Sequence, residues 1–251
     1  MDLSKVSFWM AGRYATNCVE ISDDPASLNK AGFWAVVNTF EGKWICARFK
    51  DVQDMPLPKV PWQSIETAWQ SSQSAAEYQS NVALIKEQIA AGDIYQVNLC
   101  RILSADCDQG LHGLANKLQS ENPAPYASYF KLPDLEIASA SPELFLHRQG
   151  DLIKSTPIKG TSATEEFGEK DRAENVMIVD LMRNDFGRIC KTGSVKVSQL
   201  FRSELHPGLE HLVSDVVAEV RDELTWAQIF KEILAPGSVS GAPKESAVNI
   251  I

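Results

Sequence analysis

Apolar and polar residues follow one another in patterns that predict both strands and helices. Two short β-rich runs, 33–37 and 44–47, flank a Glu-Gly pair, which predicts a hairpin. The proline-bearing stretch 55–61 then predicts an irregular connection. We therefore expect a strand-rich N-terminal segment over residues 1–70 and a second, larger domain over residues 71–251.

The chain beyond residue 71 alternates between helical and strand patterns. Apolar residues at helical spacing precede Gly92, and they predict a helix that ends at this glycine. A strand pattern over 95–103 and a short helical pattern over 111–118 follow. Four further apolar runs predict strands at 126–132, 135–140, 144–147 and 152–155. Because only one helix interrupts these strands, we expect an α+β fold with an antiparallel or mixed sheet.

A third helical pattern, over 168–188, carries two acidic residues that are candidates for metal binding. Asp171 and Glu174 are three positions apart, so their carboxylates share one face of the helix. Mg²⁺ usually takes one or two carboxylates together with substrate oxygens and water. A solvated acidic helix start, stabilised by the helix dipole, explains the same pair without a metal.

The last part of the chain combines a strand, a helix and a loop of small residues. A strand is predicted at 209–220 and carries His211, and a helix is predicted at 225–234. The Gly/Ser/Pro loop 236–244 contains Pro243, which is placed to start a helix whose backbone N–H groups can bind an anion. Most such loops are simply connections, and this one lacks the residue order of a P-loop.

Lys159 is the candidate nucleophile. It lies beside Gly160 and sixteen positions after Glu143, which belongs to a Ser-Pro-Glu sequence. An amine attacks carbon only when it is uncharged, which requires desolvation or a neighbouring cation. Taken alone, this residue is better explained as a surface lysine at the end of a strand.

Composition excludes several classes of partner. The chain has 251 residues, of which 44% are hydrophobic and 23% charged, as in an ordinary globular protein. A net charge of −9 argues against nucleic acid or an anionic membrane as a partner. No apolar run is long enough to cross a bilayer, and the N-terminal residues do not resemble a secretory signal. Five scattered cysteines fit reduced thiols, so we expect a cytoplasmic protein.

Six sequence blocks give the chain a resemblance to a known family. They are GDIYQVNL (92–99), SPELF (141–145), PIKGT (157–161), DRAENVMIVDLMRNDFGR (171–188), HLVS (211–214) and GSVSGAPK (237–244). In these blocks the chain resembles the chorismate-utilising enzymes. The resemblance implies an anthranilate synthase-like α/β sandwich with mostly antiparallel sheets and Mg²⁺ as cofactor. It also implies a longer protein, so we expect this chain to be incomplete at its C-terminus.

The lysine in PIKGT is typical of the branch of this family that aminates chorismate at C4 for para-aminobenzoate and folate synthesis. The resemblance implies that Glu143 protonates the departing C4 hydroxyl while Lys159 attacks C2 and forms a covalent adduct. Ammonia, from a separate glutamine amidotransferase subunit, would then enter at C4 and expel the lysine to give 4-amino-4-deoxychorismate. Anthranilate and isochorismate synthases, which act at C2, typically carry a small residue in place of this lysine.

Further roles follow from the same resemblance. Glu174, with Asp171 as a helper, is expected to bind Mg²⁺. The residues expected to contact chorismate are Thr161, His211, Ser240, Gly241 and Ala242. Two alternatives stay open, a related enzyme that acts at C2 and a non-catalytic remnant or binding subunit. A Schiff-base aldolase is compatible with the lysine but has no other support in the sequence.

Overall fold

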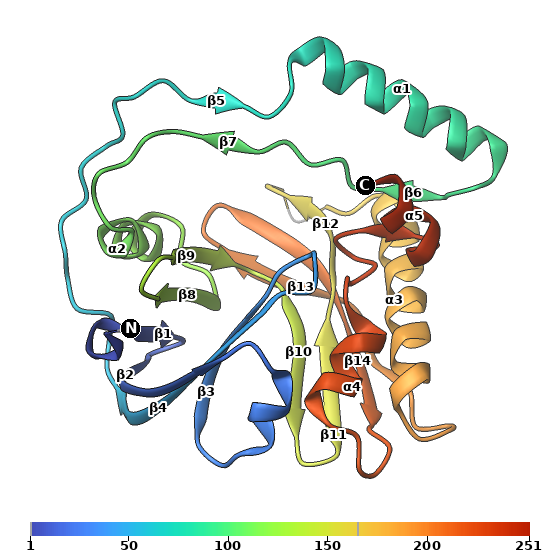
Figure 1. Cartoon of the computed structure of the whole chain (residues 1–251). Helices are drawn as coiled ribbons and strands as arrows, with labels where there is room; N and C mark the ends of the chain where they lie inside the picture. Colours follow the sequence, from blue (N-terminus) through green and yellow to red (C-terminus); the bar gives the residue numbers. More distant parts are fainter. Residues whose placement is uncertain (1, 165) are drawn as a thin grey trace.

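The computed structural model describes residues 2–164 and 166–251, which form two large antiparallel sheets with helices on several sides of them (Figure 1). The first sheet has six strands in the order β3-β4-β2-β1-β8-β9. Their bounds are Ser7–Met10 (β1), Arg13–Ser22 (β2), Phe33–Asn38 (β3), Trp44–Asp54 (β4), Tyr126–Lys131 (β8) and Glu136–Ser141 (β9). Strands from both sides of residue 70 therefore build one sheet, and the expected division at that residue stays a prediction.

The second sheet is built around one long strand. Its members are Leu144–Gln149 (β10), Leu152–Thr156 (β11), Ile158–Ser162 (β12), Lys196–His206 (β13) and Leu209–Glu219 (β14). Strand β14 pairs with β11 and β12 along one edge and with β13 along the other. All these pairings are antiparallel, which confirms the predicted α+β fold.

Two helices cover the second sheet (Figure 1). They are Glu169–Ile189 (α3) and Trp226–Ile233 (α4). The α3 sequence buries residues at helical spacing, among them Ile178, Met182 and Phe186. Met182 and Phe186 belong to one core cluster with Val216 of β14 and Ile229 of α4, and each of these four side chains is at most 1% exposed. This packing fixes α3 against the strands that carry the candidate site.

The remaining helices are ten residues long or shorter, except α1, which lies outside the two large sheets. They are Ala75–Ala91 (α1), His112–Glu121 (α2), Lys244–Ile250 (α5) and the 3₁₀ turns Leu3–Lys5 and Pro25–Asn29. Helix α1 begins with a capping box between Ser74 and Glu77 and ends at Gly92, whose φ of +85° gives the predicted glycine C-cap. None of its residues is buried, and Figure 1 shows it outside the two sheets.

The predicted strand at 95–103 is wrong. Only Gln96–Val97 (β6) and Leu103–Ser104 (β7) have strand structure there, and β7 pairs with Gln70–Ser71 (β5). The segment lies outside both large sheets, and Ile102 is 66% exposed, so it has no apolar surface on which alternating side chains could be buried. Its β6 portion instead pairs with Gly241–Ala242 (β15), far along the chain.

Candidate active site

Lys159 lies in β12, and its side chain reaches the loop that precedes α5. Its Nζ donates a hydrogen bond to the carbonyl oxygen of Ser238 at 3.4 Å, and the residue is half-buried. The next residue, Gly160, has a φ of +94°, and a Cβ there would lie 3.1 Å from the Cβ atoms of both Asp171 and Leu212. A glycine is therefore required for β12 to lie this close to α3 and β14.

Glu143 follows β9 and is brought to the same place. Burial raises the pKa of its carboxyl above the ordinary value. The Ile158 N–H, the Lys159 ammonium and the Ser238 hydroxyl oppose this shift without cancelling it. Ser238 thus relates to both residues: its side chain lowers the pKa of Glu143, and its carbonyl oxygen accepts from Lys159. A carboxyl that keeps its proton to higher pH beside an amine suits general acid catalysis coupled to nucleophilic attack.

The loop that contains Ser238 is held by a segment about 140 positions earlier in the chain. Strand β15 pairs with β6, the Tyr95 N–H donates to the Ala242 carbonyl at 2.7 Å, and the Asn98 N–H donates to the Ser240 carbonyl at 2.9 Å. The Asn98 side chain also donates from Nδ2 to the Ser238 carbonyl at 3.3 Å. The same oxygen thus accepts from both Asn98 and Lys159, and this pairing could not be read from the sequence.

Ser240, Gly241 and Ala242, the predicted substrate contacts, are used to build this loop. Ser240 and Ala242 are only 2% and 6% exposed, and the Ser240 hydroxyl donates to the Pro236 carbonyl at 2.9 Å. Helix α5 begins directly after Pro243, as the sequence predicts. Contact of Ser240, Gly241 and Ala242 with substrate stays a prediction.

A buried ion pair anchors the other end of the loop. Lys244 Nζ lies 2.7 Å from Asp185 Oδ1, and the two side chains are 12% and 5% exposed. The same ammonium donates to the Ile233 carbonyl at 3.2 Å, so it ties the start of α5 to both α3 and α4. Burial raises the pKa of Asp185, although Lys244 and Arg188 oppose the shift. This pair therefore has a structural role, because it joins α3, α4 and α5.

Thr161 and His211 are brought together across β12 and β14. Thr161 Oγ1 and His211 Nδ1 are 2.9 Å apart, and the imidazole of His206 lies against that of His211 with ring centroids 4.6 Å apart. Burial, followed by the nearby His206, lowers the pKa of His211, while Glu204 opposes the shift. His211 is therefore held in its neutral form at lower pH than an ordinary histidine.

The two acidic residues of α3 differ in how free they are to hold a cation. The Gly168 N–H donates to Asp171 Oδ2 at 2.9 Å, so this carboxylate caps the helix. The Glu174 side chain is 38% exposed, and among the described residues its one ionic contact is with Lys170 at 3.6 Å. Among residues 2–164 and 166–251, no three His, Cys, Asp or Glu side chains group closely enough to hold a metal ion. Glu174 suits Mg²⁺ as one of several ligands, whereas Asp171 is already engaged.

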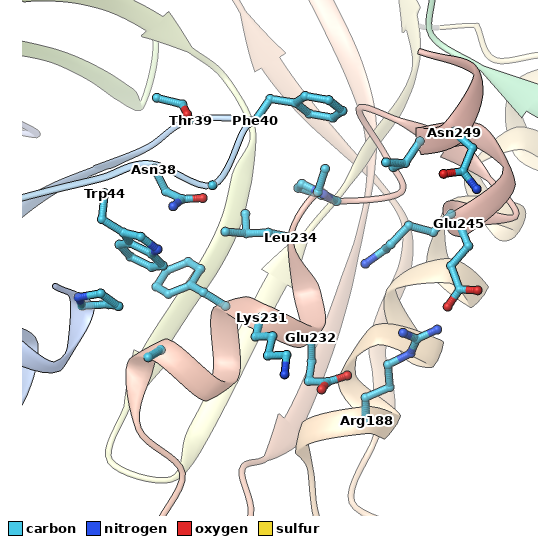
Figure 2. A pocket seen from close by; sticks show the side chains of 18 residues that line it. Asn38, Thr39, Phe40, Trp44, Arg188, Lys231, Glu232, Leu234, Glu245 and Asn249 are labelled. Atoms are coloured by element: carbon cyan, nitrogen blue, oxygen red, sulfur yellow. The ribbon is translucent and has the colours of Figure 1, made fainter. Parts of the chain in front are cut away.

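A cavity of about 860 Å³ lies elsewhere, between the β3–β4 hairpin, α4 and α5 (Figure 2). Its lining includes Trp44, Leu234 and Arg188 but neither Lys159 nor Glu143. The cavity mixes aromatic surface with side chains of both charges, and no single ligand chemistry follows from it. The cluster around Ser238 is therefore the better candidate site, because its groups have complementary chemistry.

In the part of the chain that the structure describes, no helix is both long and apolar enough to cross a membrane.

Comparison with known proteins places these residues in context. A protein-family profile described as chorismate binding enzyme matches residues 38–251. Aminodeoxychorismate synthase component 1 of Salmonella typhimurium is 36% identical over 219 residues, which cover 82% of this chain and 48% of that protein. Anthranilate synthase component 1 1 of Haloarcula marismortui is 34% identical over 211 residues, covering 79% of this chain and 43% of that protein. The chain thus spans about half the length of the curated relatives it matches.

Two solved structures also resemble this chain. Anthranilate synthase component I from Streptococcus pneumoniae superposes with a TM-score of 0.67 at 30% identity, covering 81% of this chain and 45% of that one. The menaquinone-specific isochorismate synthase of Escherichia coli has a TM-score of 0.76 at 14% identity, covering 98% of this chain and 72% of that one. At this low identity the second match supports only the fold.

Proposed function

Because the chain belongs to the chorismate binding enzyme family, we propose that it carries the lysine and the acid of an aminodeoxychorismate synthase. The reaction would convert chorismate and ammonia into 4-amino-4-deoxychorismate and water, in the cytoplasmic synthesis of para-aminobenzoate for folate. The observation that carries the proposal is the meeting of Lys159 and Glu143 around Ser238. Relatives named aminodeoxychorismate synthase component 1 support it.

In the proposed mechanism, Glu143 is the general acid and Lys159 the nucleophile. The uncharged Lys159 amine attacks C2 of chorismate, the ring double bonds shift, and the C4–O bond breaks. Glu143 donates its proton to the departing hydroxyl, which leaves as water; its raised pKa favours the protonated form that this step requires. Ammonia then attacks C4, the double bonds shift back, and the C2–N bond to Lys159 breaks.

The other predicted residues have supporting roles in this proposal. Thr161, His211, Ser240, Gly241 and Ala242 would line the substrate site, with the Thr161–His211 hydrogen bond fixing the imidazole. Glu174, with the capping Asp171 as a weaker helper, would hold Mg²⁺. When bound, the ion would neutralise the ring carboxylate of chorismate.

We assign the supply of ammonia to a separate glutamine amidotransferase subunit. A glutaminase of this kind uses an activated cysteine nucleophile. Burial raises the pKa of Cys18, Cys46 and Cys190, which makes these thiols poor nucleophiles. The name component 1 of the relatives also supports a protein of more than one component.

A covalent adduct on Lys159 is the decisive test. The purified chain is incubated with chorismate and Mg²⁺ without ammonia, quenched in acid and analysed by intact mass and peptide mapping. We expect a gain equal to chorismate minus water on the peptide that contains Lys159, and no gain in Lys159→Ala. Absence of the adduct while chorismate still binds would overturn the assignment of the nucleophile.

A second candidate function is amination at C2, because relatives named anthranilate synthase match at 34% identity. The two reactions give different products. With ammonia present, an amino group at C4, identified by NMR, supports the first proposal, and one at C2 supports the second.

A further inference from the structure

Asn175 is a buried carboxamide in α3 that faces two strands of the candidate site. It is 1% exposed. Its Nδ2 donates to the Leu212 carbonyl of β14 at 3.0 Å and to the Lys159 carbonyl of β12 at 3.4 Å. Its Oδ1 accepts from the Ser214 hydroxyl at 2.5 Å. Both N–H groups and the oxygen of the amide are therefore used.

The backbone at Lys159 lies at an irregular point of the sheet. The ladder between β12 and β14 pairs Ile158 with Val213 and Thr161 with His211, and its register shifts between these two pairs. Lys159 and Gly160 lie in that irregular stretch. Asn175 donates to the Lys159 carbonyl from α3, at the point where the register of the ladder shifts.

The stability of the helix does not account for asparagine at this position. Asparagine is a poor helix former, and burying a carboxamide is unfavourable unless all its hydrogen bonds are made. The adjoining Ser214 is fully buried and accepts from the Phe201 N–H at 3.1 Å, so the network extends into β13. Such a fully satisfied network defines one backbone arrangement rather than several.

We propose that Asn175 is a positioning residue that sets the backbone of Lys159 relative to its neighbours in the site. Leu212, its second partner, follows His211 directly, and Glu174 precedes Asn175 in the chain. One amide thus joins the segments that carry the nucleophile, the histidine and the metal-binding candidate. The roles of these three residues rest on the proposed function, whereas the positioning of Lys159 rests on the hydrogen bonds.

The test compares Asn175→Ala with Ser214→Ala. Both variants lose a buried hydrogen bond of the same network, but only the first removes the donor to the Lys159 carbonyl. The full chain is pulsed with an amine-reactive reagent, trinitrobenzenesulfonate, over a range of pH, and the labelling of Lys159 is followed by peptide mass spectrometry. Exposed Lys86 serves as the internal reference.

We expect Asn175→Ala to change the rate of Lys159 labelling relative to Lys86, and Ser214→Ala to change it less. In the chorismate assay, Asn175→Ala should slow adduct formation by about 10- to 100-fold with little change in KM, because a misplaced nucleophile reacts slowly even when substrate is bound. Labelling of Asn175→Ala at the wild-type rate across the pH range would overturn the proposal.

The proposal stays testable if Asn175→Ala fails to fold or if the wild-type chain forms no adduct. If Asn175→Ala does not fold, Asn175→Ser replaces it, since a serine there is too short to reach β12 but keeps a hydroxyl for Ser214; wild-type labelling of that variant would also overturn the proposal. If the wild-type chain forms no adduct with chorismate, the proposed function fails, yet the labelling comparison still decides whether Asn175 positions Lys159.

Discussion

Gly241 is the residue at which a single methyl group should disturb the candidate site most directly. Its φ is +152°, and it pairs with Val97 between β15 and β6. A Cβ there would lie 2.2 Å from the Gln96 carbonyl oxygen, 2.9 Å from Val97 Cα and 2.8 Å from the Ala247 Cβ. Two of these atoms belong to the backbone and cannot rotate away, so Gly241→Ala must separate β6 from β15.

The size of the effect follows from two contributions. Overpacking a filled site costs about 1–3 kcal/mol, and a side chain in a backbone region reserved for glycine costs about 1–3 kcal/mol more, so about 2–6 kcal/mol in total is expected. A typical domain is stable by only about 5–15 kcal/mol. Because the β6–β15 pairing is two residues long, the loop can also detach locally and limit the global loss.

Urea unfolding and amide hydrogen exchange measure the two responses separately. The Tyr95 and Asn98 amides, which donate to the Ala242 and Ser240 carbonyls, should lose protection in Gly241→Ala. Gly150→Ala is the matched control, since Gly150 has a φ of +62° with no atom within 4 Å of its Cβ position. This control should lose only about 1–2 kcal/mol from backbone strain. Equal stability losses in the two variants, with exchange at residues 95 and 98 unchanged, would refute the reasoning.

Three other variants test the charged groups around the site. Lys244→Met leaves Asp185 buried without its partner and should lower the free energy of unfolding by about 3–5 kcal/mol. Its control is Lys231→Met, which should change this free energy little, because Lys231 lies in the cavity wall and in none of the ion pairs found among the described residues. Equal losses in urea titrations of the two variants would contradict this. The raised pKa of Glu143 contributes stability at acid pH, and this stability is lost as pH rises through the folded-state pKa. Glu143→Gln should therefore be more stable than wild type at neutral pH and lose that advantage in acid. A stability difference that does not depend on pH would exclude this cause. Asp215 is the opposite case: burial raises its pKa, but Lys154, Thr156 and Arg202 together lower it by more, so the net shift is downward. Asp215→Asn should therefore be less stable than wild type at neutral pH, and this stability difference should disappear in acid, below the folded-state pKa. A difference that persists in acid would count against this explanation.

The elements predicted from the sequence are those with strong local signals. Helix α3 buries Ile178, Met182 and Phe186 at helical spacing, and α1 ends at Gly92, so both could be recognised from periodicity and capping. Strand β13 was not predicted because its register against β14 shifts twice, which breaks the alternation of inward and outward side chains. The β6–β15 pairing was missed because two-residue strands in loops carry no periodic pattern.

The candidate site shows the same division. Lys159 and Glu143 were identified from short blocks that resemble a family, and the structure brings both to Ser238. Asn98 and Asn175 were missed because their side chains act on backbone carbonyls of segments far away in the sequence. Any residue type offers such a carbonyl, so only the folded arrangement of the chain shows which ones are used. An asparagine in the interior of a predicted apolar helix was the one available signal.

Helix α3 is bonded both to the backbone of Lys159 and to the end of the loop that carries Ser238. Near its start Asn175 bonds to the Lys159 carbonyl, and near its end Asp185 pairs with Lys244 at the end of the loop that carries Ser238. A helix rises about 1.5 Å per residue, so these buried polar groups lie about 15 Å apart along the helix axis. The apolar residues between them pack on the second sheet, which keeps this distance fixed. The 3.4 Å contact between Lys159 and Ser238 thus closes a ring of connections through α3, and losing either polar anchor should let the amine and the loop move apart.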